Sequence, residues 1–154
     1  MSKSVEQSSF WETKYSTAEY RWDLGQPTPP LVAFFEGTIT PSSGKIVVLG
    51  CGRGHDAVFL ADQGLAVTAV DFAPSAIAAT EELAQEKEVS LTTLEQDIFN
   101  LEKTHKGYFD YLFEHTCFCA IAPECCEHHV IFQNVSPTHE GHPTYVPVQL
   151  SQAA

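Results

Sequence analysis

The chain of 154 residues is long enough to form one domain with a substantial core. Its formal net charge is -12, with 8 Lys and Arg against 20 Asp and Glu, so its surface repels phosphate backbones and anionic lipids. No run approaches the roughly 20 apolar residues of a membrane span, and no signal pattern opens the chain. We therefore expect a cytoplasmic protein with neither a nucleic-acid nor a membrane partner.

Two short helices are expected before the first strand. The first covers residues 8–15, with Ser8 or Ser9 as its N-cap and large aromatic side chains for contacts. The second covers residues 31–36, after the proline-rich stretch 26–30 that a helix cannot cross.

Beyond residue 44, apolar strands alternate with helices. Strands are predicted at 45–49, 65–70, 89–94 and 108–113, and helices at 56–63 and 74–87. Gly64 suits the end of the first of these helices, and Pro74 suits the first turn of the second. This alternation predicts an α/β fold, a doubly wound parallel sheet of the Rossmann-like type. In such a sheet the ligand crevice lies outside the carboxyl ends of the strands.

The segment after the first predicted strand is rich in glycine and reads GCGRGHD from Gly50 to Asp56. Glycine accepts positive φ and has no Cβ, so this turn can be tight and a ligand can lie against its backbone. Asp71 ends the second strand about twenty residues later, where a carboxylate can accept both hydroxyl protons of a ribose. Residues 45–71 therefore predict a site for the adenosyl part of a cofactor.

Other nucleotide sites fit this turn less well. A nicotinamide or flavin site requires G-x-G-x-x-G/A, but His55 stands where the last glycine should be. A phosphate-binding P-loop is excluded because no Gly-Lys-Ser/Thr follows the turn. An NAD-dependent oxidoreductase stays a weaker alternative, and the turn alone could simply connect a strand to a helix.

The five cysteines are an odd number, which argues against a disulfide framework. Four of them lie between Cys117 and Cys126 with histidines nearby, but they lack the paired spacing of a structural zinc site. We expect thiols and no metal, with a Cys/His metal-binding arm as the alternative.

Several short motifs together suggest a family. They are Phe10-Trp11, RWDLG at 21–25, Thr28-Pro29, LGCGRGHD at 49–56, Val70-Asp71, Asp97-Ile98, and FCAI at 118–121 followed by Pro123. With these motifs the chain resembles the class I S-adenosylmethionine-dependent methyltransferases, and more narrowly the thiopurine S-methyltransferase family with its halide and thiol methyltransferase relatives. The resemblance implies a seven-stranded sheet, S-adenosyl-L-methionine as cofactor, and methyl transfer to a small soft nucleophile such as a thiol, a thiopurine or a halide.

The resemblance also implies which residues bind the cofactor. Aromatic residues surround the sulfonium, the turn lies against the methionine part, and acidic and apolar side chains bind the ribose and the adenine. The implied set is Trp11, Tyr15, Trp22, Gly50, Gly52, Asp71, Asp97, Ile98 and His115. The structural alternatives are that the aromatic residues are core residues and that Asp97 caps a turn.

No catalytic residue is assigned, because sulfur nucleophiles are partly ionised near neutral pH and need mainly positioning and desolvation. If a general base exists, His115 and Glu114 after the fourth strand are the candidates.

The resemblance covers most of residues 8–124 and ends after Pro123, so residues 1–124 are expected to form the cofactor-binding methyltransferase domain. Residues 125–154 are predicted to be a divergent, irregular tail, which we interpret as the product of a frameshift or truncation. The sheet would then have about four of seven strands, with the fourth at an apolar edge. A strand at 144–150 paired beside the fourth would contradict this hypothesis. The alternative function is therefore a protein that binds the cofactor without catalysis.

Overall fold

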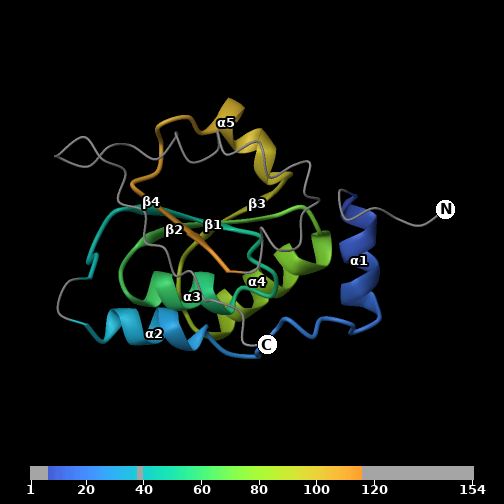
Figure 1. The fold of residues 1–154 in the computed structure, drawn as a ribbon, viewed down its shortest axis with the longest axis horizontal. Helices are drawn as coiled ribbons and strands as arrows, with labels where there is room; N and C mark the ends of the chain where they lie inside the picture. The colour runs from blue at the N-terminus through green and yellow to red at the C-terminus, as the bar shows by residue number, and fades with distance from the viewer. Residues whose placement is uncertain (1–6, 38–39, 116–154) are drawn as a thin grey trace.

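The computed structural model describes residues 7–37 and 40–115. The helices and strands in chain order are α1 (Ser8–Ser16), α2 (Pro29–Phe35), β1 (Lys45–Leu49), α3 (His55–Asp62), β2 (Ala66–Asp71), α4 (Pro74–Glu86), β3 (Thr92–Glu95), the 3₁₀ turn η1 (Ile98–Asn100), α5 (Leu101–Thr104) and β4 (Tyr111–Glu114). The four strands form one parallel sheet in the order β3-β2-β1-β4 (Figure 1). The predicted doubly wound parallel sheet is confirmed.

Successive side chains of β1 point to opposite faces of the sheet, and each face is covered by a core. Ile46 and Val48 pack with residues of α2 and α3, whereas Val47 and Leu49 pack with residues of η1 and α5. Figure 1 shows α2, α3 and α4 below the sheet and α5 above it. A strand covered on both faces has to be apolar throughout, which is why KIVVL was recognisable from sequence.

The sheet has a switch point at β1. The chain passes from β1 to β2 and β3 on one side and then returns to β4 on the other side of β1. Leu49, the last residue of β1, is in register with Val70 of β2 and with Glu114 of β4. Ligand crevices of open parallel sheets lie at such a point, outside the carboxyl ends of the strands.

Two strands begin three residues later than predicted, and local backbone bonds explain the difference. After α4, Glu88 has a φ of 56° and the Val89 N–H donates to the Ala84 carbonyl at 3.0 Å, so this stretch closes the helix. Before β4, the Tyr108 N–H donates to the His105 carbonyl at 3.1 Å, which places Tyr108 in a turn.

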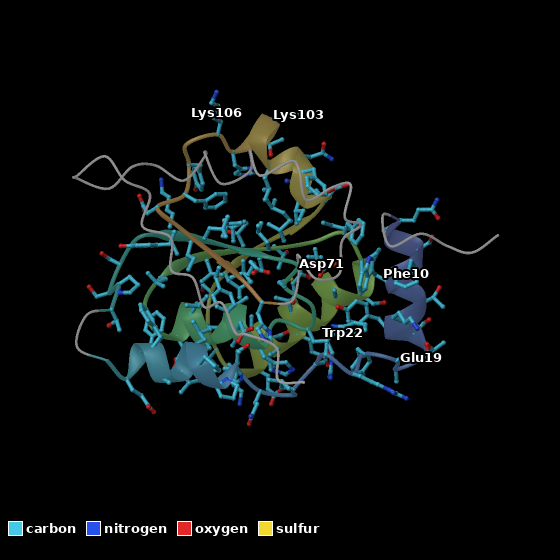
Figure 2. The ribbon with its side chains drawn as sticks, in the orientation of Figure 1. Phe10, Glu19, Trp22, Asp71, Lys103 and Lys106 are labelled. Carbon is cyan, nitrogen blue, oxygen red and sulfur yellow. The ribbon has the colours of Figure 1, made fainter. Side chains whose placement is uncertain are left out.

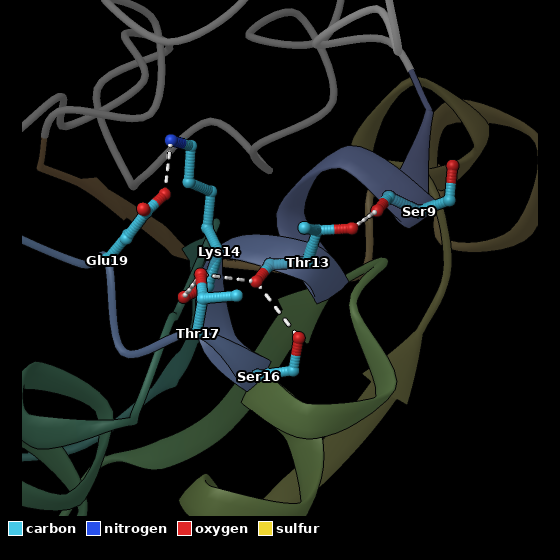
Figure 3. A network of polar contacts seen from close by, with 6 residues as sticks. All are labelled: Ser9, Thr13, Lys14, Ser16, Thr17 and Glu19. Carbon is cyan, nitrogen blue, oxygen red and sulfur yellow. Dashed lines mark hydrogen bonds and ion pairs between the residues drawn. The ribbon is translucent and has the colours of Figure 1, made fainter.

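The predicted N-cap of α1 is wrong. The N-cap residue is Gln7, which makes no side-chain capping bond, and Ser9 instead accepts a hydrogen bond from Thr13 Oγ1 through its carbonyl at 2.8 Å. At the other end, the hydroxyls of Ser16 and Thr17 donate to the Thr13 carbonyl (Figure 3). No residue of α1 is buried, so polar surface contacts and half-buried aromatic rings determine its position.

The second helix begins at Pro29 rather than residue 31. Thr28 is its N-cap, and a proline in the first turn removes only an N–H that would lack a helical partner.

Within the described residues, no helix is long and apolar enough to cross a membrane.

Candidate cofactor site

The glycine turn after β1 adopts the backbone conformation that its sequence predicts. Gly50, Gly52 and Gly54 have φ values of 61°, 55° and 87°. A Cβ on Gly54 would lie 2.6 Å from Thr80 Oγ1, and Thr80 is fully buried in α4. The same hydroxyl donates to the Gly52 carbonyl at 3.0 Å. The turn is therefore fixed against α4 by close packing as well as by its dihedral angles.

Asp71, the predicted ribose ligand, lies at the end of β2 directly beside this turn. Its carboxyl is 8% exposed and accepts the Gly52 N–H on Oδ2 and the Ala73 N–H on Oδ1, each at 3.0 Å. Burial raises the pKa of Asp71, while these backbone hydrogen bonds and one from Phe72 lower it. Each oxygen has a second lone pair, so the carboxylate can still accept a hydroxyl proton from a ligand.

Aromatic side chains from α1 and the following loop form a cluster next to the turn. The ring centroids of Trp11 and Trp22 are 5.6 Å apart, and those of Tyr15 and Trp22 are 6.0 Å apart, both edge to face. Phe10 extends the cluster at 5.1 Å from Trp11, and Tyr20 stacks on Tyr15 at 6.0 Å. Figure 2 shows Phe10, Trp22 and Asp71 on the side of the sheet that faces α1, away from Lys103 and Lys106.

Tyr15 brings this cluster into contact with the turn. Its hydroxyl lies 3.3 Å from the position that a Cβ on Gly52 would occupy. Burial, followed by the nearby charge of Asp71, raises the pKa of Tyr15, so the phenol is a neutral donor at physiological pH. Aromatic faces at this position suit a cationic ligand group.

An open pocket adjoins the turn. It is lined by residues of segment 22–28, by the turn and first helical residues 50–56, and by His115 after β4. The pocket is thus at the switch point between β1 and β4. Of the predicted site residues, those that line it are Trp22, Gly50, Gly52 and His115.

The remaining predicted residues lie outside this lining. Asp71 and Tyr15 meet the turn at Gly52, and Trp11 packs against Trp22. Ile98 is buried in the core on the α5 face.

Asp97 caps η1, accepting the Phe99 N–H on Oδ1 at 2.9 Å, as the structural alternative predicted. The sequence argument passed over Gln96, the residue before it. Its side-chain nitrogen is buried without a hydrogen-bond partner in the described part of the chain, and its backbone N–H donates to the Asp71 carbonyl at 3.1 Å. A buried donor in this state can be satisfied by a polar ligand. A polar residue directly after the third strand was the available signal.

Glu12 is a second residue that sequence reasoning missed. The N-cap of α4 is Ala73, which has no side chain able to cap the helix. Glu12 of α1 supplies the missing acceptor: Oε2 accepts the Ser75 N–H at 3.0 Å, and Oε1 accepts a short hydrogen bond from the Ser75 hydroxyl. This contact joins α1 to the start of α4.

Cys51 in the turn is a free thiol, 3.5 Å from Thr80 Oγ1. Burial, together with the nearby charge of Asp71, raises its pKa to about 12, so the thiol is unreactive. The other cysteines lie outside the described residues. Among the described ones, no group of three or more His, Cys, Asp and Glu residues is placed to hold a metal.

Comparison with known proteins identifies the family. The sequence profile of the thiopurine S-methyltransferase (TPMT) family matches residues 6–149. The chain belongs to this family. The match runs past residue 124, where our sequence-based resemblance ended.

Individual relatives agree with the family assignment. The chain is 33% identical over 124 residues to probable thiol methyltransferase 2 of Arabidopsis thaliana, covering 78% of this chain and 53% of that protein. It is 28% identical over 112 residues to a thiopurine S-methyltransferase of Shewanella piezotolerans, covering 64% of this chain and 50% of that protein. The chain spans about half the length of the curated relatives that it matches.

A solved structure confirms the fold. Phosphoethanolamine N-methyltransferase 2 of Haemonchus contortus, solved with S-adenosylhomocysteine, superposes with a TM-score of 0.67 over 88% of this chain and 34% of that one. At 19% sequence identity this likeness concerns the fold alone, and it supports the Rossmann-like assignment.

Proposed function

We propose that this protein binds S-adenosyl-L-methionine and transfers its methyl group to a small soft nucleophile, a thiol, a thiopurine or a halide. The observation that carries the proposal is the arrangement around Gly52. Its N–H is bonded to the buried Asp71 carboxylate, and the Tyr15 hydroxyl lies 3.3 Å from the position that a Cβ on Gly52 would occupy. A carboxylate for ribose hydroxyls and an aromatic wall for a sulfonium therefore meet at one turn. Family membership and the names of the relatives support the same chemistry.

The residues present fit such a cofactor. Asp71 offers acceptors for the ribose hydroxyls, the unpartnered amide of Gln96 offers a donor beside it, and Tyr15 with Trp22 offers aromatic surface for a cation. When bound, the cofactor supplies an electrophilic methyl group on a sulfonium.

The chain's part in the transfer is to position the acceptor and to exclude water. The pocket at the switch point adjoins Gly50, Trp22 and His115, so it can hold an acceptor beside the aromatic wall. A thiol or a halide needs little proton removal near neutral pH, so orientation and desolvation supply most of the rate. His115 can act as the general base if the methyl acceptor is neutral and has to lose a proton.

Calorimetry with S-adenosylmethionine tests the binding half of the proposal. Asp71→Asn keeps the size of the side chain but replaces one acceptor oxygen with an NH2 group that faces a backbone N–H, so both the turn and acceptance from ligand hydroxyls are weakened and the Kd is expected to rise about 30-fold. Asp62→Asn, an exposed change at the end of α3, is the matched control and should leave the Kd unchanged. Absence of binding by the wild type would sink the proposal, and preferential binding of NAD would restore the oxidoreductase alternative.

Turnover is tested separately, because a protein of half the relatives' length could bind without catalysis. Transfer of a labelled methyl group to a small thiol, to a thiopurine or to iodide supports the enzyme. Binding without transfer to any of them favours the non-catalytic alternative.

Location, partners and domain division belong to the same proposal. The odd number of cysteines and the free Cys51 thiol support the cytoplasm, and the net charge of -12 argues against nucleic acid. The irregular tail at 125–154 and the strand that would contradict it lie outside the described residues, so the division after residue 124 stays a prediction.

A further inference from the structure

Asp23 is a buried charge in segment 22–28, the wall of the pocket. Its side chain is 6% exposed, and its Oδ1 accepts the Gly25 N–H at 2.6 Å. The same oxygen lies 3.3 Å from His55 Nε2, and Oδ2 lies 3.5 Å from Arg53 Nη1. The carboxylate therefore shapes its own loop with one bond and contacts the glycine turn and the start of α3 through two basic side chains.

The far end of the segment is attached to α3 as well. Asp56, in the first turn of α3, accepts the Thr28 N–H at 2.7 Å on one oxygen and the Thr28 hydroxyl at 2.8 Å on the other. Thr28 is 2% exposed. Two carboxylates thus join the segment to residues 53–56. Asp23 belongs to the segment and contacts the turn and α3, whereas Asp56 belongs to α3 and contacts the segment.

These contacts give a role to residues of the GCGRGHD motif other than its glycines. Gly50, Gly52 and Gly54 shape the turn, whereas Arg53, His55 and Asp56 make contacts to segment 22–28. We infer that Asp23 with Arg53 and His55 forms a clasp that positions Trp22 for cofactor binding. Asp23 is a positioning residue, because it acts through its neighbour Trp22. This inference rests in part on the proposed function.

The clasp can affect the site because Trp22, next to Asp23 in the chain, belongs both to the pocket and to the aromatic cluster. Trp22 lines the pocket and also packs edge to face against Trp11 and Tyr15. If the loop at Asp23 loosens, the ring of Trp22 loses its fixed orientation, and the wall beside Gly52 loosens with it. Ligand binding then has to include the cost of ordering this wall.

The two basic partners of Asp23 lie in different surroundings. His55 Nε2 is buried and makes no well-aligned hydrogen bond within the described residues, so Asp23 is its main polar neighbour. The Arg53 side chain is 40% exposed and also lies 5.0 Å above the Tyr20 ring. Arg53→Gln therefore removes a partly solvated charge and leaves the buried Asp23 carboxylate with the Gly25 N–H and His55 as its polar neighbours.

The test compares Asp23→Asn, Arg53→Gln and the double variant. Asparagine keeps an acceptor for the Gly25 N–H, so the loop turn is preserved while the charge is removed. Each single change is expected to raise the Kd for S-adenosylmethionine about fivefold to tenfold in calorimetry. Arg53→Gln removes one of the two basic contacts that Asp23→Asn weakens, so the double variant should bind no worse than Asp23→Asn alone. Glu19→Gln, at an exposed ion pair with Lys14, is the control and should bind normally.

A second measurement does not depend on the cofactor. In a Trp11→Phe background Trp22 is the sole tryptophan, and Asp23→Asn or Arg53→Gln should raise its acrylamide quenching constant about twofold through local opening. The clasp would be overturned if the quenching constant of Trp22 did not change and if the two substitutions had additive effects, or no effect, on the Kd. If the wild type does not bind S-adenosylmethionine but quenching rises, the proposed function fails while the clasp is supported.

Discussion

The glycine turn and helix α1 meet where the Tyr15 hydroxyl approaches Gly52, and they are held in opposite ways. The turn is fixed by left-handed glycines, by the fully buried Thr80 and by the buried Asp71 carboxyl. Helix α1 has no buried residue, and its polar contacts in Figure 3 are exposed. Substitutions in the turn should therefore reduce the stability of the fold, whereas substitutions on α1 should mainly affect how the aromatic wall is ordered.

The largest effect is expected for Gly54→Ala. The new methyl group would meet Thr80 at 2.6 Å, and the residue would have to keep a φ of 87°. Left-handed strain and overpacking together should lower the free energy of unfolding by about 3 kcal/mol, measured by urea denaturation.

Gly25→Ala is the matched control for this change. Gly25 also has a positive φ, 67°, but a Cβ there would meet nothing within 4 Å. Its cost should be only the backbone strain, about 1 kcal/mol. Equal losses for the two variants would show that Thr80 does not restrain the turn.

Glu12→Ala tests the main polar attachment of α1. It removes the acceptor for the Ser75 N–H at the start of α4, where no local side chain replaces it. Thermal or urea unfolding should show a loss of about 1.5 kcal/mol. Glu82→Ala, on the exposed surface of α4, is the control and should be neutral. A neutral result for Glu12→Ala would mean that the aromatic contacts alone hold α1.

The buried thiol of Cys51 predicts a loss of stability at alkaline pH. Its folded pKa of about 12 lies above the ordinary value of 9.0, so between these values the unfolded chain releases a proton that the folded protein keeps. Stability is complete below pH 9 and falls as the pH rises toward 12. From pH 8 to 10 the wild type should lose about 1 kcal/mol more than Cys51→Ser. Parallel pH profiles for the two proteins would contradict a buried, neutral thiol.

The sequence was sufficient for the parts of the site that depend on neighbouring residues in the chain. Gly50 to Gly54 and the β-branched run of β1 predicted the turn, and Asp71 was found from the length of one strand-helix-strand unit. Contacts between distant segments were not predictable. The pairing of Glu12 with Ser75 joins residues 63 apart, and that of Thr28 with Asp56 joins residues 28 apart. Such pairs depend on how the helices pack, so no local pattern indicates them.

Strand ends show the same limit at shorter range. Val89 and Tyr108 are strand-like residues, yet the closing bonds of α4 and the turn before β4 use their backbone N–H groups. Strand propensity reflects the side chains, whereas the residue at which a strand begins depends on which carbonyl each backbone N–H bonds to.

The smallest effect is expected for the exposed pair of Lys14 and Glu19, 2.9 Å apart at the end of α1. The hydrogen bond and charge of Lys14 lower the pKa of Glu19 below its ordinary value of 4.5. A lowered folded pKa stabilises the protein above the ordinary pKa, and this contribution disappears as the pH falls through the folded pKa. Because solvent and salt screen the pair, Glu19→Gln should shift the melting temperature by less than about 1 °C at pH 7, and by less still at acidic pH or in 1 M salt. A shift of several degrees that survives high salt would mean that α1 is held by its surface charges, and the contrast between α1 and the glycine turn would then fail.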